Sequence, residues 1–378
     1  MINTTYYQDL TKMNTFGMKV KARCFMEYDS VADLVDIEFE ELARPVLHIG
    51  GGSNLLFTDD FKGTVLHSKI NFIEILEDGS DVLVSVGSGV VFDDFCAWAA
   101  KEGLWGVENL SYIPGEVGAS AVQNIGAYGV EVKDVIRTVY CYDTVEEEFV
   151  KFDVEECEYG YRDSVFKDPE VKGRYVVTHV LFALSRTPQP RLDYGHLRDA
   201  VMASSVSLSS DPRPATSSLT HPLAGGGMSL PSDTEEAMMS RLTPALIRRV
   251  IIKIRKEKLP EPSVMGSAGS FFKNPVITAE HFARMEAAAK AELGSDYKVP
   301  HYDLPDGTVK VPAAWMIEQC GWKGRRSGGA AVYDKQPLVI VNYTGDAYPE
   351  EIVGLERRII ASVKAKFNID LHPEVEHV

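Results

Sequence analysis

Apolar residues along this chain either alternate with polar residues or recur at helical spacing, and segments of the two kinds are interspersed. Alternation over Val20–Met26 predicts a strand with one buried face, and the apolar run Pro45–Ile49 predicts another. Helical spacing behind a serine predicts a helix over Ser30–Glu41. Because strands and helices do not follow a strict βαβ order, we predict an α+β fold. The same criteria predict further strands at Leu55–Phe57, Phe72–Leu76, Asp81–Val86, Val135–Tyr142, Glu148–Phe152, Tyr175–Leu184 and Leu338–Val341, and further helices at Val91–Glu102, Pro244–Lys258, Ala279–Ala291, Ala313–Cys320 and Tyr348–Phe367.

The middle of the chain changes character. Residues 201–235 are rich in serine, proline and glycine and contain no aromatic residue, so we predict a flexible insertion that cannot build a core. Thr243 and Pro244 then have the residue types of an N-cap and a first helical position, and the helix they start ends before Pro260. Most of the cations on this helix are predicted to form a solvated face, namely Arg248, Arg249, Lys253 and Lys256.

Composition narrows the class of protein. The 378 residues are 45% apolar and 25% charged, as in ordinary soluble proteins, and are numerous enough for two or three domains. A net charge of −16 argues against nucleic-acid binding. The cysteines are five, scattered and without CxxC spacing, which favours reduced thiols over a disulfide framework or a zinc site. The sequence shows no signal peptide and no membrane span, so we expect a soluble cytoplasmic protein without metal, membrane or nucleic-acid partners.

The chemistry of the chain is concentrated in a glycine-rich stretch, Glu108–Gly129. Glycine costs stability inside strands and helices, so this composition favours a backbone that lies close to a ligand. Unpaired backbone N–H groups in such a loop can bind phosphate oxygens. The apolar residues within it argue against disorder. We therefore predict a buried, backbone-lined cradle whose glycines are Gly106, Gly115, Gly118, Gly126 and Gly129.

A second phosphate-binding candidate is Gly50–Asn54, which lies between two predicted strands. It is not a GxGxxG segment opening a helix, so a Rossmann nucleotide site is not predicted. Taken alone, a hairpin turn is the simpler interpretation of this segment.

Three segments together resemble one enzyme family. Glu108–Gly129, Tyr159–Ser164 and Gly266–Pro275 are similar to the UDP-N-acetylenolpyruvoylglucosamine reductases, which make a precursor of bacterial peptidoglycan. Gly50–Phe57 and Pro373–Val375 match as well, and the resemblance covers nearly the whole chain except residues 201–235. The form of the second segment is similar to the longer subclass of the family.

The resemblance implies a fold and a division into domains. The fold is an FAD-binding fold of the vanillyl-alcohol-oxidase (PCMH) type in two α+β subdomains, followed by an α+β substrate-binding domain. The implied units are FAD-binding subdomains at 1–67 and 68–200, the insertion at 201–235, a connecting helix at 236–258 and the substrate-binding domain at 259–378.

The resemblance also implies the reaction and its catalytic residues. FAD, bound non-covalently and reduced by NADPH, passes a hydride to the enolpyruvyl ether of UDP-N-acetylglucosamine, giving UDP-N-acetylmuramate. Arg162 and Glu374, the latter protonated or sharing a proton, stabilise the negative charge that develops on the substrate carboxylate, and Ser270 donates a proton to the neighbouring carbon. Either Asn274 or Lys258 could orient Ser270. The enzyme is expected to act as a monomer.

The binding residues come from the same resemblance. Those expected to contact FAD are Gly50, Gly51, Gly52, Ser53, Asn54, Leu55, Glu108, Ile113, Pro114, Gly115, Gly118, Ala119, Ser120, Asn124, Gly126, Ala127 and Gly129. Those expected to contact the substrate are Gln123, Tyr128, Tyr161, Tyr194, Lys258, Asn274 and Gln319.

Other readings of the sequence remain open at this point. Taken singly, Arg162 is most simply part of a surface ion pair, Ser270 a turn residue and Glu374 a solvated carboxylate. A different FAD oxidoreductase, such as an alcohol or lactone oxidase, is the second enzyme hypothesis. A flavin-binding sensor without catalysis is a third. The insertion at 201–235 either loops into solvent or alters closure over the substrate.

Overall fold

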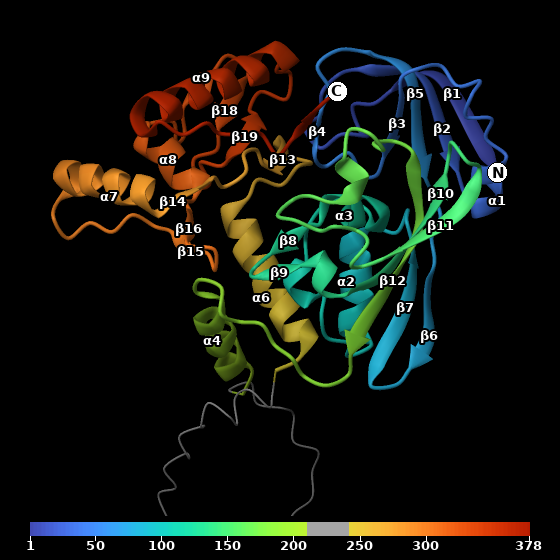
Figure 1. The fold of residues 1–378 in the computed structure, drawn as a ribbon, viewed down its shortest axis with the longest axis horizontal. Helices are drawn as coiled ribbons and strands as arrows, with labels where there is room; N and C mark the ends of the chain where they lie inside the picture. The colour runs from blue at the N-terminus through green and yellow to red at the C-terminus, as the bar shows by residue number, and fades with distance from the viewer. Residues whose placement is uncertain (210–241) are drawn as a thin grey trace, which may run out of the picture.

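The computed structural model describes residues 1–209 and 242–378 (Figure 1). The first part of the chain forms a mixed sheet in the order β1-β2-β5-β3, in which β1 pairs antiparallel with β2 and the other pairs are parallel. A short helix, α1, follows β2. The elements are β1 (Ile2–Asp9), β2 (Lys21–Tyr28), α1 (Val31–Val35), β3 (Val46–Ile49) and β5 (Phe61–Ser68).

A second, fully antiparallel sheet has the order β11-β10-β12-β7-β6. Figure 1 shows α2, α3 and α6 on one side of it, with α4 beyond α6. Two small strands, β8 and β9, form a hairpin after α3. The elements are β6 (Ile73–Asp78), β7 (Asp81–Gly87), α2 (Phe92–Lys101), α3 (Val117–Gln123), β8 (Gly126–Ala127), β9 (Val130–Glu131), β10 (Ile136–Asp143), β11 (Glu148–Asp153), β12 (Tyr175–Ser185), α4 (Leu197–Ser209) and α6 (Pro244–Lys258), with 3-10 turns at Glu108–Leu110, Val132–Asp134 and Val165–Lys167.

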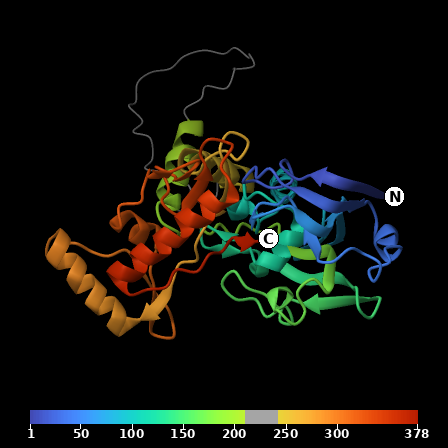
Figure 2. The same cartoon turned by 90° about the horizontal axis from the view of Figure 1, so that it is seen from above.

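The last part of the chain contains a sheet of order β13-β19-β18-β17 and a smaller one of order β14-β16-β15. Helices α7, α8 and α9 gather beside them, and the final strand, β20, crosses back to pair with β4 of the first part (Figures 1 and 2). The elements are β4 (Leu55–Leu56), β13 (Gly266–Ser270), β14 (Val276–Thr278), α7 (Ala279–Leu293), β15 (Tyr302–Asp303), β16 (Thr308–Lys310), α8 (Ala313–Gln319), β17 (Arg326–Ser327), β18 (Ala330–Val332), β19 (Val339–Asn342), α9 (Pro349–Phe367) and β20 (Glu376–His377).

One apolar core joins the first and last parts of the chain. Leu10 and Phe16 of the N-terminal sheet region are completely buried in the same cluster as Phe271 and residues of α9, and the rings of Phe16 and Phe271 meet edge to face at 6.2 Å. A separate core lies under the second sheet and contains the buried residues of α2 and α3. The first sheet and the C-terminal part are therefore packed together through a shared core.

The predicted α+β class is confirmed, and most predicted elements lie within a few residues of the observed ones. The cap of α6 forms as expected, since the Thr243 hydroxyl accepts a hydrogen bond from the Leu246 N–H at 3.1 Å. All five cysteines lie in the described residues and are free thiols, as expected. None of the helices in the described part of the chain combines the length and hydropathy that a bilayer span requires.

Two predicted features of the backbone were wrong. The helix predicted over Ser30–Glu41 ends at Val35. Ile37 and Phe39 are both buried, and positions two apart would lie on opposite faces of a helix, so a turn is needed to bury both. The glycine-rich stretch, expected to contain no helix, includes α3, where a Cβ at Gly118 would lie 2.8 Å from the Ser88 Cβ.

Two further predictions about the middle of the chain need correction or lie outside the described residues. Residues 201–209, assigned to the flexible insertion, are the second part of helix α4, whereas 210–241 lie outside the described residues. Arg248 does not belong to a solvated face, because its guanidinium forms an ion pair with the carboxylate of Asp93 on α2 and is mostly buried.

Candidate active site

A cavity of about 740 Å³ lies where the first two sheets and their helices (the first half of the molecule) meet the C-terminal part (the second half). This size is typical of sites for organic ligands. Its walls come from the glycine segment after β3, from α3 and the loop before it, and from strands β3 and β12. The C-terminal part contributes the end of β13 and the last residues of the chain.

Two glycine-rich segments touch each other along one wall of this cavity. A Cβ at Gly51 would lie 3.3 Å from the Cα of Gly115, so neither backbone has room for a larger residue without movement. The Ser53 hydroxyl donates a hydrogen bond to the Pro114 carbonyl at 3.0 Å. Gly52 has a φ of +59° and faces the Met13 carbonyl so closely that a Cβ would overlap it. The wall is thus made largely of backbone.

Most of the residues expected to contact a cofactor line this cavity. They are Gly50, Gly51, Gly52, Ser53, Asn54, Leu55, Ile113, Pro114, Gly115, Gly118, Ala119, Ser120 and Gly126. The other four do not line it. Glu108 is buried, its carboxylate accepts a hydrogen bond from the Gly106 N–H at 2.7 Å, and burial raises its pKa. Ala127 and Gly129 lie in and beside the β8–β9 hairpin.

Asn124, the fourth, forms hydrogen bonds to several neighbouring segments of the chain. It is completely buried and ends α3 in the left-handed conformation, with a φ of +45°. Its side-chain amide donates to the Gly160 carbonyl at 2.8 Å and to the Glu131 carboxylate at 3.0 Å, and its side-chain oxygen accepts from the Lys133 N–H at 3.3 Å. Its backbone carbonyl accepts a hydrogen bond from the Arg162 guanidinium at 3.3 Å. Asn124 therefore fixes the surroundings of Arg162.

Arg162 and Glu374 meet inside the cavity although they are 212 positions apart in the chain. The Nε of Arg162 donates to the Glu374 Oε1 at 2.7 Å, and their side chains are only 18% and 14% exposed. A second nitrogen of the guanidinium donates to the Gly126 carbonyl at 2.8 Å. Arg162 has a φ of +56°, a conformation that a non-glycine residue adopts only where its surroundings enforce it.

The backbone of Glu374 connects the two halves of the molecule. Its N–H donates to the Phe271 carbonyl at 2.8 Å, and its carbonyl accepts from the Asn54 side chain at 3.1 Å. Ser270, immediately before Phe271, also lines the cavity at the end of β13. An irregularity in the β13–β19 pairing precedes it, and its hydroxyl makes no hydrogen bond to any described residue. The three residues expected to be catalytic thus line one cavity.

The residues expected to contact the substrate are more dispersed. Gln123 lines the cavity, and Tyr161 lies under the Arg162 guanidinium at 5.4 Å. The Asn274 side chain donates to the Tyr161 hydroxyl at 3.4 Å and accepts from the Ala313 N–H at 2.9 Å. Tyr194 is partly exposed and contacts the ring of Tyr128.

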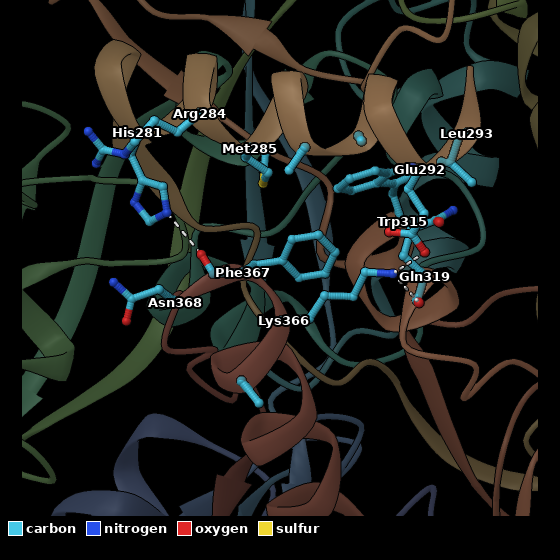
Figure 3. Close-up of a pocket in the computed structure, with 13 residues that line it drawn as sticks. His281, Arg284, Met285, Glu292, Leu293, Trp315, Gln319, Lys366, Phe367 and Asn368 are labelled. Carbon is cyan, nitrogen blue, oxygen red and sulfur yellow. Dashed lines mark hydrogen bonds and ion pairs between the residues drawn. The ribbon is translucent and has the colours of Figure 1, made fainter. Parts of the chain in front are cut away.

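Two expected substrate residues lie outside this group. Lys258 is exposed at the end of α6. Gln319 lines a different pocket of about 360 Å³ between α7, α8 and the end of α9 (Figure 3). Its backbone carbonyl there accepts a hydrogen bond from the Lys366 ammonium at 3.2 Å. The structure does not bring Gln319 to the large cavity.

Three cations in the cavity wall were not predicted, and one of them, Lys172, is ion-paired with Glu376. Lys167 donates to the Arg162 carbonyl at 2.9 Å and to the Gln123 side-chain oxygen at 3.2 Å, and burial lowers its pKa. Arg255 on α6 donates to the Tyr112 carbonyl at 3.0 Å and forms no ion pair within the described residues. Arg248 and Arg255 are seven residues apart and share a helix face, but nothing in the sequence marks that face as buried.

A buried histidine compensates an acidic residue of the wall. Glu116 lines the cavity, and its Oε1 lies 2.9 Å from the His67 Nε2. The other ring nitrogen of His67 lies 3.1 Å from the Glu27 carboxylate. Burial lowers the pKa of His67, but the two carboxylates outweigh this and leave that pKa above its ordinary value. The two carboxylates therefore favour the protonated form of His67 beside the glycine segments.

Comparison with known proteins agrees with this geometry. Residues 23–149 match the sequence model of an FAD binding domain, and residues 261–378 match that of the C-terminal domain of UDP-N-acetylenolpyruvoylglucosamine reductase. A protein of Bacteroides fragilis with that enzyme name is 46% identical over 98% of both chains. The chain belongs to the UDP-N-acetylenolpyruvoylglucosamine reductase family. Other members include those of Porphyromonas gingivalis, 41% identical over 98% of this chain and 97% of its own, and Chromobacterium violaceum, 42% identical over 97% and 96%.

A solved structure shows the family's fold. The crystal structure of UDP-N-acetylenolpyruvylglucosamine reductase from Thermus caldophilus has a TM-score of 0.61 to this chain, at 20% identity, and covers 100% of this chain and 98% of its own. The FAD-binding fold followed by a C-terminal family domain, expected from the sequence, is therefore confirmed.

The residues present fit FAD as the cofactor. The backbone wall formed by Gly50–Asn54 and the loop before α3 offers N–H groups without side chains in the way. Arg255 lines the same cavity as a cation without a carboxylate partner among the described residues, which suits an anionic ligand. The FAD-binding domain match covers both of these segments and strands β6, β7 and β10 of the second sheet.

Proposed function

We propose that this chain reduces the enolpyruvyl ether of UDP-N-acetylglucosamine to UDP-N-acetylmuramate, with FAD as cofactor and NADPH as reductant. The observation that carries the proposal is that Arg162, Ser270 and Glu374 line one cavity together with the glycine wall. Bound FAD supplies the hydride chemistry that side chains lack. The proposal keeps two cofactor-binding subdomains, 1–67 and 68–200, and a substrate-binding domain, 259–378, because residues from all three line the cavity.

Arg162 is proposed to stabilise negative charge on the substrate. Reduction at the carbon β to the carboxylate delocalises charge into that carboxylate. The guanidinium has five N–H groups, of which three bind Glu374, Asn124 and Gly126. Two N–H groups thus remain for the substrate carboxylate. Because the side chain is mostly buried, these hydrogen bonds act in a medium of low polarity, where they stabilise a developing anion most.

Glu374 and Ser270 are proposed to complete the site. Glu374 fixes the orientation of the guanidinium through its bond to Nε. The Ser270 hydroxyl, without a partner in the described residues, is available to donate its proton to the carbon α to the substrate carboxylate. Serine is a weak acid, but an enolate carbon is a strong base, so the transfer is favourable.

The nucleotide part of the substrate is proposed to lie beside a group of aromatic residues and one lysine. The Lys310 ammonium lies 4.8 Å from the Tyr161 ring centroid and forms no ion pair within the described residues. The rings of Tyr194 and Tyr302 stack at 6.4 Å and are partly exposed. Asn274 joins this group through its bond to Tyr161. A cation and exposed rings suit a diphosphate and a base. We propose that the enzyme acts as a cytoplasmic monomer, since one chain contributes every residue named above.

The half-reactions of Ser270→Ala test the proposal. NADPH should reduce the bound flavin within about twofold of the wild-type rate, whereas the enolpyruvyl substrate should reoxidise it at least about 100-fold more slowly, the scale of a lost general acid. Stopped-flow absorbance measures both steps. Ser263→Ala, which changes an exposed serine of the same segment, is the control and should leave both steps unchanged. Equal slowing of both steps in Ser270→Ala would show that the role of Ser270 is wrong, and wild-type turnover with alcohols and oxygen alone would refute the reaction.

A further inference from the structure

Residues 372–378 form a segment that is bonded on both sides, to the C-terminal domain and to the glycine wall. Figure 2 shows its strand β20 between the helices of the C-terminal part and the first half of the chain. On one side the segment bonds to residues 271–273, and on the other to 54–58. The backbone bonds run from Lys273 N to His372 O at 2.9 Å, Glu374 N to Phe271 O at 2.8 Å, Glu376 N to Asn54 O at 2.9 Å, Val378 N to Leu56 O at 2.9 Å and Thr58 N to Val378 O at 2.8 Å.

One side chain of this segment reaches helix α9. The Nε2 of His377 lies 3.1 Å from the Oε2 of Glu356, which is 5% exposed and projects from the buried face of α9. Glu356 has no other ion pair among the described residues, and its Oε2 accepts no hydrogen bond from any of them. A buried carboxylate is costly unless a cation neutralises it, so His377 is the group that makes this position tolerable.

The surroundings of His377 favour its protonated form. The contact with the Glu356 carboxylate raises the pKa of His377 above the ordinary histidine value, while burial and the nearby Arg357 oppose this less strongly. Glu376, the neighbouring acid, is paired with Lys172, and the ring of Phe271 lies 6.3 Å from the imidazole. Because the pKa is raised, the stabilisation is complete below about pH 6.5 and is lost as the pH rises through the folded-state value.

We propose that His377 is a positioning residue: its ion pair with Glu356 holds residues 372–378 against α9 and thereby holds Glu374 against Arg162. The backbone of Glu374 lies three residues before His377 in the same segment. Loss of the pair frees this end of the segment from α9. The claim that this position of Glu374 serves catalysis rests on the proposed function. The claim that the ion pair holds residues 372–378 against α9 does not.

Hydrogen exchange tests the holding directly. The N–H groups of Glu376 and Val378 donate to Asn54 and Leu56, so their protection factors report whether the segment is docked. In His377→Gln at pH 6 these factors should fall about tenfold, the effect of losing one interaction with a charged group. In the wild type they should fall by the same factor as the pH rises through the His377 pKa, and His377→Gln should show no such step.

Two further proteins serve as controls. Glu356→Gln removes the buried anion, so the pH-dependent fall in the protection factors should move to lower pH. Asp370→Asn removes an exposed ion pair with Lys364 on the same helix, 2.6 Å long, and should behave as the wild type. Wild-type protection in His377→Gln at pH 6 would overturn the proposal. If a variant does not fold, NMR titration of the His377 ring in the wild type decides: a midpoint at or below about 6.5 would also overturn it.

Steady-state kinetics with NADPH and the enolpyruvyl substrate test the positioning role. The kcat of His377→Gln should fall about tenfold at pH 6, the scale of a small misplacement of a catalytic group, and the kcat of the wild type should fall over the same pH range as the protection factors. A kcat that stays constant while protection falls would refute the positioning role. A wild-type protein without reductase activity would instead refute the proposed function, and the protection factors would still decide whether His377 holds the segment.

Discussion

Replacing Asn124 tests whether its side chain supports the fold or contacts the cofactor, as its glycine-rich surroundings suggest. Asn124→Ala removes three hydrogen bonds, to Gly160, Glu131 and Lys133, each of which stabilises the fold by about 1 kcal/mol. It also places alanine in the left-handed conformation, which costs about 1 kcal/mol more. The free energy of unfolding should therefore fall by about 3–4 kcal/mol, measured by urea unfolding of the apoprotein with linear extrapolation.

Asn368→Ala provides the matched control. Asn368 also ends a helix in the left-handed conformation, with a φ of +55°, but it is exposed and makes no side-chain hydrogen bond to a described residue. Its replacement should cost only the conformational part, about 1 kcal/mol. A difference between the two variants below about 1 kcal/mol would refute the hydrogen-bond account.

The kinetic signature of Asn124→Ala is equally specific. The Asn124 and Gly126 carbonyls accept hydrogen bonds from the Arg162 guanidinium, so a shift of this backbone misplaces Arg162. The kcat for substrate reduction should fall by about tenfold to 100-fold, the scale of a small misplacement of a catalytic group. The affinity for FAD, measured by flavin fluorescence, should stay within about threefold because the side chain does not line the cavity. A large loss of FAD affinity at constant kcat would show direct contact instead.

Two further predictions concern an ion pair and a misplaced binding residue. Burial raises the pKa of Asp93, but hydrogen bonds from Arg248 and from a backbone N–H outweigh this and leave the pKa below its ordinary value. The stabilisation is therefore present above about pH 4 and is lost as the pH falls through the folded-state pKa. Asp93→Asn should lower the free energy of unfolding by about 2–3 kcal/mol at pH 7 and by much less at pH 3. An equal loss at both pH values in urea unfolding would contradict this. Gln319→Ala should leave the KM for the UDP substrate within about twofold of wild type. Asn274→Ala should raise this KM about tenfold, the effect of one lost hydrogen bond. Initial-rate kinetics would contradict the placement of Asn274, and not Gln319, beside the substrate if Gln319→Ala had the larger effect.

Local patterns in the sequence were sufficient for most of the elements. Alternation over Asp81–Val86 and Tyr175–Leu184 depends only on which residues face the core, and these strands pair as β7 and β12. The start of α6 was predictable because a threonine cap and a proline at the first position act within one turn. Such features need no knowledge of distant residues.

Features that depend on distant partners were not predictable. Arg248 is indistinguishable in sequence from its solvated neighbours, and its partner Asp93 lies 155 positions away. Asn124 lies among glycines that line the cavity, and its side-chain bonds to residues 131, 133 and 160 could not be read from that context. Arg162, Ser270 and Glu374 could be named only through family resemblance, since each residue type alone is common on surfaces.

Arg162, Ser270 and Glu374 line one cavity only when the two halves of the molecule are packed against each other. Glu374 and the residue after Ser270 share a backbone hydrogen bond, so these two functional groups are fixed to each other within the C-terminal part. Arg162 comes from the other half, where Asn124 and Gly126 hold its guanidinium. Separation of the halves would leave each group locally intact but would break the 2.7 Å bond from Arg162 to Glu374. A displaced Glu374 would leave the Nε donor of a mostly buried guanidinium without its partner. The energetic cost of that unpaired donor favours the arrangement in which the three proposed catalytic residues line one cavity.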